Sequence, residues 1–164
     1  MLRFGILTVS DRSARGERPD LSGPALQQAV EAADGIVVRT GLVPDDYHTL
    51  RDTLAEWADR DDLDVLLTTG GTGFAPRDVT PEATLAVVER QAPGLAEAMR
   101  AASLRITPHA MLSRAVAGIR KSTLIINLPG SPKAAVENLE VVLPVLAHAV
   151  QLLRSDPRAE AGHR

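Results

Sequence analysis

The residues with the clearest chemical character lie in the run T-T-G-G-T-G-F-A-P-R-D-V-T-P-E, from Thr68 to Glu82. Glycine allows positive φ and lets a ligand approach the backbone closely, so successive N–H groups in a glycine-rich loop can form an anion-binding nest. The candidate nest residues are Thr69, Gly70, Gly71, Thr72 and Gly73. A bare G-G-x-G often only makes a turn, but the full run is more specific and indicates a phosphate site.

The flanking residues place this loop between a strand and a helix. Val65 to Leu67 is a short apolar run, typical of a strand buried on both faces of a parallel sheet. Thr80 is a suitable N-cap, and Pro81 suits the first helical position. We therefore expect Asp78 to lie in the loop, just before a helix N-terminus.

Three more polar segments follow apolar runs. Ser10 and Asp11 come after the run from Phe4 to Val9, and Asp45 comes after Leu42-Val43-Pro44. Arg12, Arg15 and Arg18 follow in the first of these loops and could face phosphate, although surface arginines are usually solvated. Asp46 is better explained as a helix cap. The last segment is Pro129-Gly130-Ser131-Pro132, where Ser131 can cap a helix and leave N–H groups for an anion.

Hydrophobic periodicity supplies the elements that must position these loops. Helices are predicted from Ser22 onward, over Asp46 to Asp59, Pro81 to Arg90 and Gly94 to Arg105, and after Ser131, with Pro144 either kinking the last helix or starting a new one. Strands are predicted at Phe4 to Val9, from Ile36, at Val65 to Leu67, and as a hairpin of Val116 to Ile119 with Thr123 to Leu128.

This alternation predicts one three-layer α/β/α domain with a mostly parallel sheet, covering residues 1–154 and followed by a disordered tail over 155–164. In an open parallel sheet, ligands bind outside the carboxyl ends of the strands. Since every candidate segment follows a predicted strand, we expect all of them to meet in one cleft.

Composition narrows the class of protein. The net charge of −3 and the 2% aromatic content argue against nucleic acid and against anionic membranes as partners. There are no cysteines, which excludes disulfides and thiolate chemistry. The N-terminus does not resemble a signal peptide, and we expect no apolar run long enough to span a membrane. A soluble, cytoplasmic protein is expected, with no role for its four histidines.

The segments T-T-G-G-T-G-x-x-x-R-D-x-T-P-E, L-V-P-D, S-D-R and N-L-P-G-S-P resemble those of the molybdopterin-binding family of molybdenum-cofactor biosynthesis, of the small single-domain MogA/MoaB type. The resemblance implies an adenylyltransferase that uses ATP and molybdopterin, with Asp45 and Asp78 as its functional carboxylates and Mg²⁺ ligands. By the same resemblance, the substrate-binding residues are Ser10, Asp11, Thr69, Gly70, Gly71, Thr72, Gly73, Pro129, Gly130, Ser131 and Pro132. A homotrimer and hand-off of the product to the molybdate-inserting enzyme are also implied.

Two alternatives remain open at this point. A non-catalytic molybdopterin-binding protein of the same fold would keep the loops as a ligand cradle. A generic nucleotide- or sugar-phosphate-binding domain would explain the glycine loop but not R-D-x-T-P-E or N-L-P-G-S-P. The sequence has no G-K-[ST] after the glycines and no nucleophile–base pair of recognisable spacing, which favours direct transfer between bound substrates.

Overall fold

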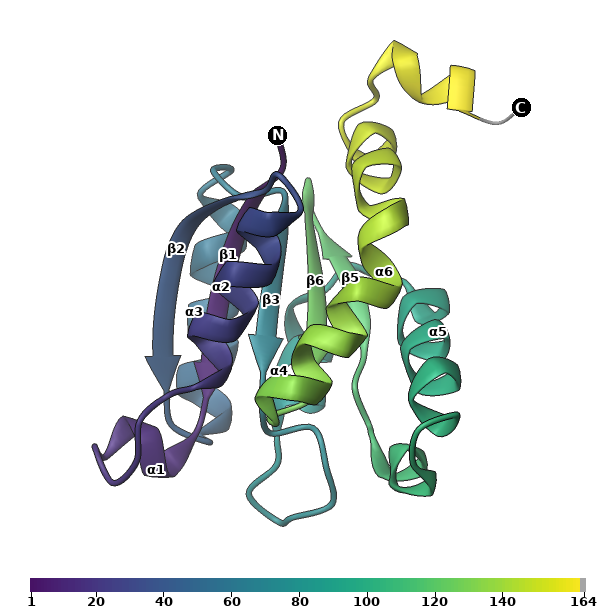
Figure 1. Ribbon diagram of the computed structural model, residues 1–164. Helices are drawn as coiled ribbons and strands as arrows, with labels where there is room; N and C mark the ends of the chain where they lie inside the picture. The colour runs from purple at the N-terminus through teal and green to yellow at the C-terminus, as the bar shows by residue number, and fades with distance from the viewer. Residues whose placement is uncertain (163–164) are drawn as a thin grey trace.

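The computed structural model describes residues 1–162 and contains one six-stranded sheet, with strand order β2-β1-β3-β6-β5-β4 (Figure 1). Neighbouring strands among β2, β1, β3 and β6 are parallel, and the β6–β5 and β5–β4 pairs are antiparallel. The strands are β1 (Arg3–Val9), β2 (Ile36–Val43), β3 (Val65–Thr69), β4 (Arg90–Gln91), β5 (Ala117–Arg120) and β6 (Thr123–Leu128).

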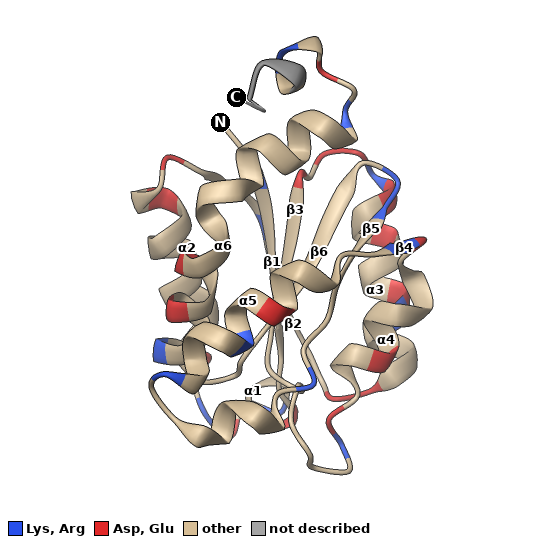
Figure 2. Cartoon of the chain, turned by 90° about the vertical axis from the view of Figure 1, so that its right-hand side faces the viewer, with Lys and Arg blue, Asp and Glu red and all other residues tan. Residues whose placement is uncertain are grey.

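Helices cover both faces of the sheet, which confirms the predicted three-layer α/β/α architecture with a mostly parallel sheet (Figures 1 and 2). The α-helices are α1 (Asp11–Ala14), α2 (Ser22–Ala32), α3 (Tyr47–Asp59), α4 (Thr80–Val87), α5 (Pro93–Leu104) and α6 (Pro132–Leu153). Two 3-10 helices complete the described chain, η1 (Pro108–Leu112) and η2 (Pro157–Gly162).

The core lies in two layers, one on each face of the sheet. On one face Phe4, Ile6 and Leu67 pack with residues of α2, α5 and α6. On the other face Leu7 and Leu66 pack with residues of α3 and α4. Because successive side chains of a strand point to opposite faces, the apolar runs of β1, β3 and β6 fill both layers at once.

The parallel pairing brings the carboxyl ends of four strands to the same edge of the sheet. Val9 lies beside Val43, and Thr69 lies beside Leu128. Each of the loops in which the sequence places a candidate site therefore starts at this edge, and the expected convergence of the loops follows from the topology.

Three local predictions about helices were wrong. The loop after β1 begins with the four-residue helix α1, for which Ser10 is the N-cap and accepts a hydrogen bond from the Ser13 N–H. The helix predicted to reach Arg90 ends at Val87, because the chain then extends and the Glu89 N–H donates to the Ile119 carbonyl. β4 forms only because β5 offers an unpaired edge there.

Thr80 does not cap α4 as predicted. The N-cap is Val79, and the Thr80 hydroxyl donates instead to the carbonyl of Gly70, 2.9 Å away. The Thr80 N–H donates to the carbonyl of Gly71. Thr80 is fully buried, so its side chain joins the start of α4 to the glycine loop rather than to its own helix.

Helix α6 is continuous, with Pro144 inside it, and it is largely uncharged (Figure 2). Its 22 residues, with a mean hydropathy of 1.4 over the most apolar 18 of them, would be enough to cross a membrane by length and composition, so the expectation that no stretch reaches that length was wrong. Leu139, Val142 and Leu146 are nevertheless buried against the sheet. The core helices of soluble proteins can pass the same composition test, and 28% of the most apolar 18 residues of α6 are buried.

The residues after α6 are folded back in the structure as η2, with Ala159 buried. Disorder over residues 155–164 remains a prediction for solution, and residues 163–164 lie outside the described residues.

At the opposite end of the sheet from the four loops, Asp64 joins three elements. Its carboxylate accepts hydrogen bonds from the backbone and guanidinium of Arg3 in β1 and from the guanidinium of Arg154 after α6. Only 5% of Asp64 is exposed. Burial alone would raise the pKa of this carboxyl, but the hydrogen bonds from Arg3 outweigh it, and the pKa lies below its ordinary value of 3.8.

Asp64→Asn is expected to lower the free energy of unfolding at pH 7 by roughly 2–4 kcal/mol, since two arginines lose their charged partner. A depressed carboxyl pKa contributes stability that is present above the ordinary pKa and lost as the pH falls through the folded value. The difference between the two proteins in chemical denaturation should therefore shrink from pH 7 to pH 3. The control Asp62→Asn, which breaks only the Arg39 pair, should cost less than about 1 kcal/mol. If Asp64→Asn lost the same free energy of unfolding at pH 7 and at pH 3, the lowered pKa assigned to Asp64 would be contradicted.

Candidate functional site

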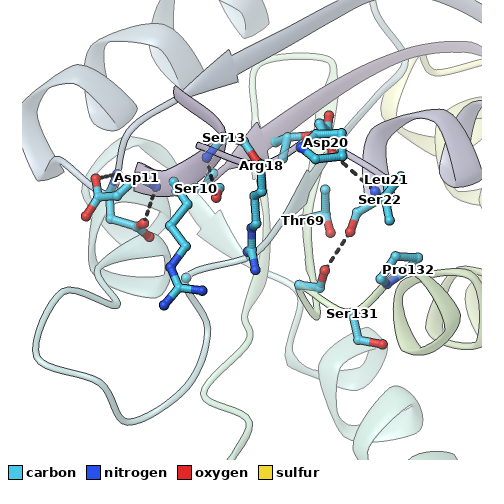
Figure 3. Close-up of a pocket in the computed structure, with 18 of the residues that line it drawn as sticks. Ser10, Asp11, Ser13, Arg18, Asp20, Leu21, Ser22, Thr69, Ser131 and Pro132 are labelled. Atoms are coloured by element: carbon cyan, nitrogen blue, oxygen red, sulfur yellow. Dashed lines mark hydrogen bonds between the residues drawn. The ribbon is translucent and has the colours of Figure 1, made fainter. Parts of the chain in front are cut away.

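A pocket of about 440 Å³ lies at the carboxyl edge of the four parallel strands (Figure 3). It collects residues from loops that are more than a hundred positions apart in the sequence. Of the predicted site residues, those that line it are Ser10, Asp11, Asp45, Thr69, Gly70, Gly71, Asp78, Gly130, Ser131 and Pro132.

The glycine loop has the left-handed backbone that the sequence suggests, but at two of its three glycines. Gly70 has φ +103° and Gly71 has φ +68°. The Gly70 N–H donates to the Leu128 carbonyl, and a Cβ on Gly70 would lie 2.3 Å from the Val9 carbonyl oxygen. The loop is thus packed directly between β1 and β6, with no room for a side chain.

Three predicted site residues do not line this pocket: Thr72, Gly73 and Pro129. They line a neighbouring apolar cavity of about 280 Å³ beside α5 and η1. The chain turns away after Gly71 because the Thr72 carbonyl is held by the Arg114 N–H, 2.8 Å away. Gly73 does not have a positive φ, so it is not part of a left-handed nest.

Asp45 lies at the pocket wall and is tied to the first loop by reciprocal hydrogen bonds. The Asp11 N–H donates to Asp45 Oδ2, and the Asp45 N–H donates to Asp11 Oδ1, both at 2.9 Å. Burial raises the pKa of the Asp45 carboxyl, the Asp11 backbone hydrogen bond lowers it, and the charges of Asp11 and Asp78 raise it again. Together these effects raise the pKa of Asp45. A positive charge beside the carboxyl would lower that pKa again and favour the ionised carboxylate.

Asp78 approaches the same pocket from the end of the glycine loop. Its Oδ2 accepts a hydrogen bond from the Ala75 N–H at 3.0 Å. Among residues 1–162, Oδ1 of Asp78 and Oδ1 of Asp45 have no hydrogen-bond partner, and no group of three or more His, Cys, Asp or Glu side chains could hold a metal ion. Two hard oxygen ligands fit Mg²⁺, which binds through one or two carboxylates together with substrate phosphates.

Three arginines line the pocket: Arg12 and Arg18, which the sequence suggested could face phosphate, and Arg77, which it did not. None of their guanidinium groups has a hydrogen-bond or ion-pair partner within the described part of the chain. Figure 3 shows the side chain of Arg18 extending into the pocket. Arg15, by contrast, pairs with Glu17 in solvent. Unpaired guanidinium groups in a concave site are suited to phosphate oxygens.

A chain of hydrogen bonds joins the first loop to the last. Asp20 accepts from the Thr8 hydroxyl at 2.7 Å and from the Ser22 N–H at 3.1 Å. The Ser22 hydroxyl then donates to the Gly130 carbonyl at 2.5 Å. No sequence pattern indicated this link, because each member is an ordinary loop residue and only the fold brings them together.

The last loop is held from the glycine-loop side as well. The Thr69 hydroxyl donates to the Pro129 carbonyl at 2.7 Å, and a Cβ on Gly130 would lie 3.3 Å from the Cα of Gly70. Ser131 caps α6, as predicted, by accepting from the Ala134 N–H. The two loops therefore form one unit, with the N-terminus of a 22-residue helix beside it.

This arrangement defines a class of protein: a three-layer α/β domain with a polar pocket at the carboxyl ends of its parallel strands, suited to phosphorylated ligands. Residues 5–148 match the family model described as "Probable molybdopterin binding domain". The chain belongs to this family, which is the family predicted from the sequence motifs, and its fold is that of the MogA/MoaB proteins.

Individual relatives agree with this placement. The chain is 49% identical to the molybdopterin adenylyltransferase of Haemophilus influenzae over 87% of its own length and 73% of that enzyme. The molybdopterin biosynthesis enzyme MoaB of Thermus thermophilus matches with a TM-score of 0.89 and 54% identity, over 96% of this chain and 99% of that one. The molybdenum cofactor synthesis protein cinnamon of Drosophila melanogaster is 44% identical over 94% of this chain. The chain spans only 26% of that longer protein.

Proposed function

We propose that the chain is a molybdopterin adenylyltransferase that transfers AMP from ATP to the terminal phosphate of molybdopterin and releases pyrophosphate. The observation that carries the proposal is the pocket composition: two carboxylates, Asp45 and Asp78, lie in one pocket with the left-handed glycines and the three arginines. The name of the Haemophilus influenzae relative supports the same reaction. A place in molybdenum-cofactor biosynthesis is supported by the family itself.

In this mechanism an oxygen of the molybdopterin phosphate attacks the α-phosphorus of ATP. The new bond joins that oxygen to the α-phosphorus, and the bond from the α-phosphorus to the bridging β-oxygen breaks, so pyrophosphate leaves with the electron pair. A phosphate oxygen is already ionised at neutral pH and needs no strong general base. The protein therefore acts by in-line positioning and by neutralising charge.

Different residues serve phosphate binding and charge neutralisation. The backbone N–H of Gly71, which has no partner among the described residues, and the guanidinium groups of Arg12 and Arg18 hold phosphate oxygens. Asp45 and Asp78 would hold Mg²⁺, which supplies charge neutralisation of the triphosphate and of the departing pyrophosphate. Without a cation the two carboxylates would repel the triphosphate.

Pterin binding is expected not to need Mg²⁺, whereas adenylyl transfer should need it, because N–H and guanidinium donors suffice for one phosphate. The test is to measure molybdopterin affinity and product formation in parallel, with Mg²⁺ and with excess chelator. Affinity should stay within about threefold, and product formation should stop. Retained transfer under chelation would remove the proposed role of the carboxylates.

The same assay separates the proposed enzyme from a non-catalytic molybdopterin-binding protein. Purified protein is incubated with molybdopterin, ATP and Mg²⁺, and adenylylated pterin and pyrophosphate are quantified. The enzyme yields both products in equal amounts. A non-catalytic molybdopterin-binding protein would bind the pterin and yield neither product. That result would refute the transfer reaction but not the proposed binding site.

On the resemblance of its motifs, we also propose that the protein acts in the cytoplasm as a homotrimer and passes its product to the molybdate-inserting enzyme of the pathway. A trimer predicts a mass of about three times 17.5 kDa by light scattering. Product that leaves the site only when the inserting enzyme is added would support the hand-off.

A further inference from the structure

Arg114, in the segment between η1 and β5, makes an unusual set of contacts with the glycine loop. Its Nε donates to the Gly73 carbonyl at 2.7 Å, and its Nη2 donates to the Asp78 carbonyl at 2.8 Å. Its Nη1 pairs with Glu82 in the first turn of α4. One side chain thus contacts both ends of the segment 73–78 and the helix that follows.

The segment 73–78 has little else to fix its position. Inside it, the Ala75 N–H donates to Asp78 Oδ2 and the Asp78 N–H donates to the Ala75 carbonyl, which closes a small turn. Phe74 at its tip is 67% exposed. The turn shapes the segment, but its orientation relative to α4 depends on Arg114.

The phosphate-facing glycines are held by other groups. Gly70 donates to Leu128 in β6, and its carbonyl accepts from Thr80. A change at Arg114 therefore leaves this half of the pocket in place and acts on the half that carries Asp78.

We propose that Arg114 is a positioning residue for Asp78: its guanidinium fork holds the segment 73–78 against α4, so that the Asp78 carboxylate stays in the pocket. This inference rests on the proposed function for its effect on catalysis, but the holding of the segment is a property of the protein alone. Arginine is required because a planar fork reaches two carbonyl oxygens and a carboxylate at once, whereas a lysine ammonium on a flexible chain cannot hold all three in fixed geometry.

The test compares Arg114→Lys with the matched control Glu82→Gln. Glu82 is half-exposed, and a glutamine there removes the charge but can still accept a hydrogen bond from Arg114, with both carbonyl contacts of Arg114 left in place. Hydrogen exchange is measured first on the proteins without substrates. In Arg114→Lys, the amides of Ala75 and Asp78 should exchange about tenfold faster, and in Glu82→Gln they should exchange as in the wild type.

Kinetics supply the second measurement. Arg114→Lys should lower kcat roughly 10- to 100-fold and raise the Mg²⁺ concentration for half-maximal rate, because a misplaced Asp78 weakens transition-state positioning. Molybdopterin affinity should change less than about threefold, since the glycines keep their own contacts. Glu82→Gln should keep the wild-type kcat within about threefold.

Each outcome decides the proposal. Wild-type exchange at Ala75 and Asp78 in Arg114→Lys overturns it, whatever the activity. A parallel loss of kcat, molybdopterin affinity and thermal stability would show a general structural role and would also overturn it. If the wild-type protein makes no adenylylated pterin, the proposed function fails, but the exchange comparison still accepts or rejects the role of Arg114 in holding the segment.

Discussion

Adenylyl transfer is expected to fall roughly 10²- to 10³-fold in Asp45→Asn and in Asp78→Asn, the size of loss seen when one preorganised electrostatic contact is removed from a transition state. Each change removes one of the two negative charges that would orient the metal nucleotide and keeps the shape of the side chain. Molybdopterin affinity should hardly change, because in the proposed site the pterin phosphate is held by N–H and guanidinium donors. The measurement is kcat together with a pterin titration.

Both variants, Asp45→Asn and Asp78→Asn, should still fold. An Asn at position 45 can still accept the Asp11 N–H, and it removes the cost of a charge in a place where burial raises the carboxyl pKa. The adjacent Asp46 supplies the control: it caps α3 through Thr49 and does not line the pocket. Asp46→Ala removes the helix cap, so it should lower stability slightly and keep its kcat. Wild-type turnover in both Asp45→Asn and Asp78→Asn would contradict the role in adenylyl transfer assigned to these two carboxylates.

Gly71→Ala is the second substitution with a large expected effect. A Cβ on Gly71 would lie 2.3 Å from Thr80 Oγ1 and 3.2 Å from Asp45 Oδ1. The positive φ adds about 1–3 kcal/mol of backbone strain. Molybdopterin affinity should therefore fall by about tenfold or more, which titration with the pterin would detect.

Gly16 offers a control that separates strain from contact. Its φ is +71°, close to that of Gly71, but a Cβ there would meet nothing within 4 Å. Gly16→Ala should cost a similar backbone strain and leave affinity unchanged. If both variants lose the same affinity, the loss comes from strain alone, and Gly71 would have no special place in the pocket.

Gly73 shows how far the loop motif can be interpreted without a structure. The spacing of the glycines suggested three equivalent residues, but only Gly70 and Gly71 have positive φ and line the pocket. Which glycines face the ligand is decided by the contact of Thr72 with Arg114, a residue about forty positions away. Local composition cannot encode that contact.

The buried strands were predictable because apolar runs such as Val65 to Leu67 identify them independently of their neighbours. The elements that were missed depend on partners. β4 is two residues long, and pairing with β5 alone defines it, while α1 is too short to show a period. Arg77 resembles any solvated arginine in sequence, and only the folded loop shows that it faces the pocket.

The ion-pair cluster at Asp64 has a consequence for how the domain can be joined to others. It fixes the beginning of β1 beside the end of α6, at the end of the sheet opposite the pocket loops (Figure 1). Polypeptide joined before Met1 or after α6 would therefore leave the domain far from the mouth of the pocket. Such a geometry suits a module in a fusion protein, consistent with the relative of which this chain spans only 26%.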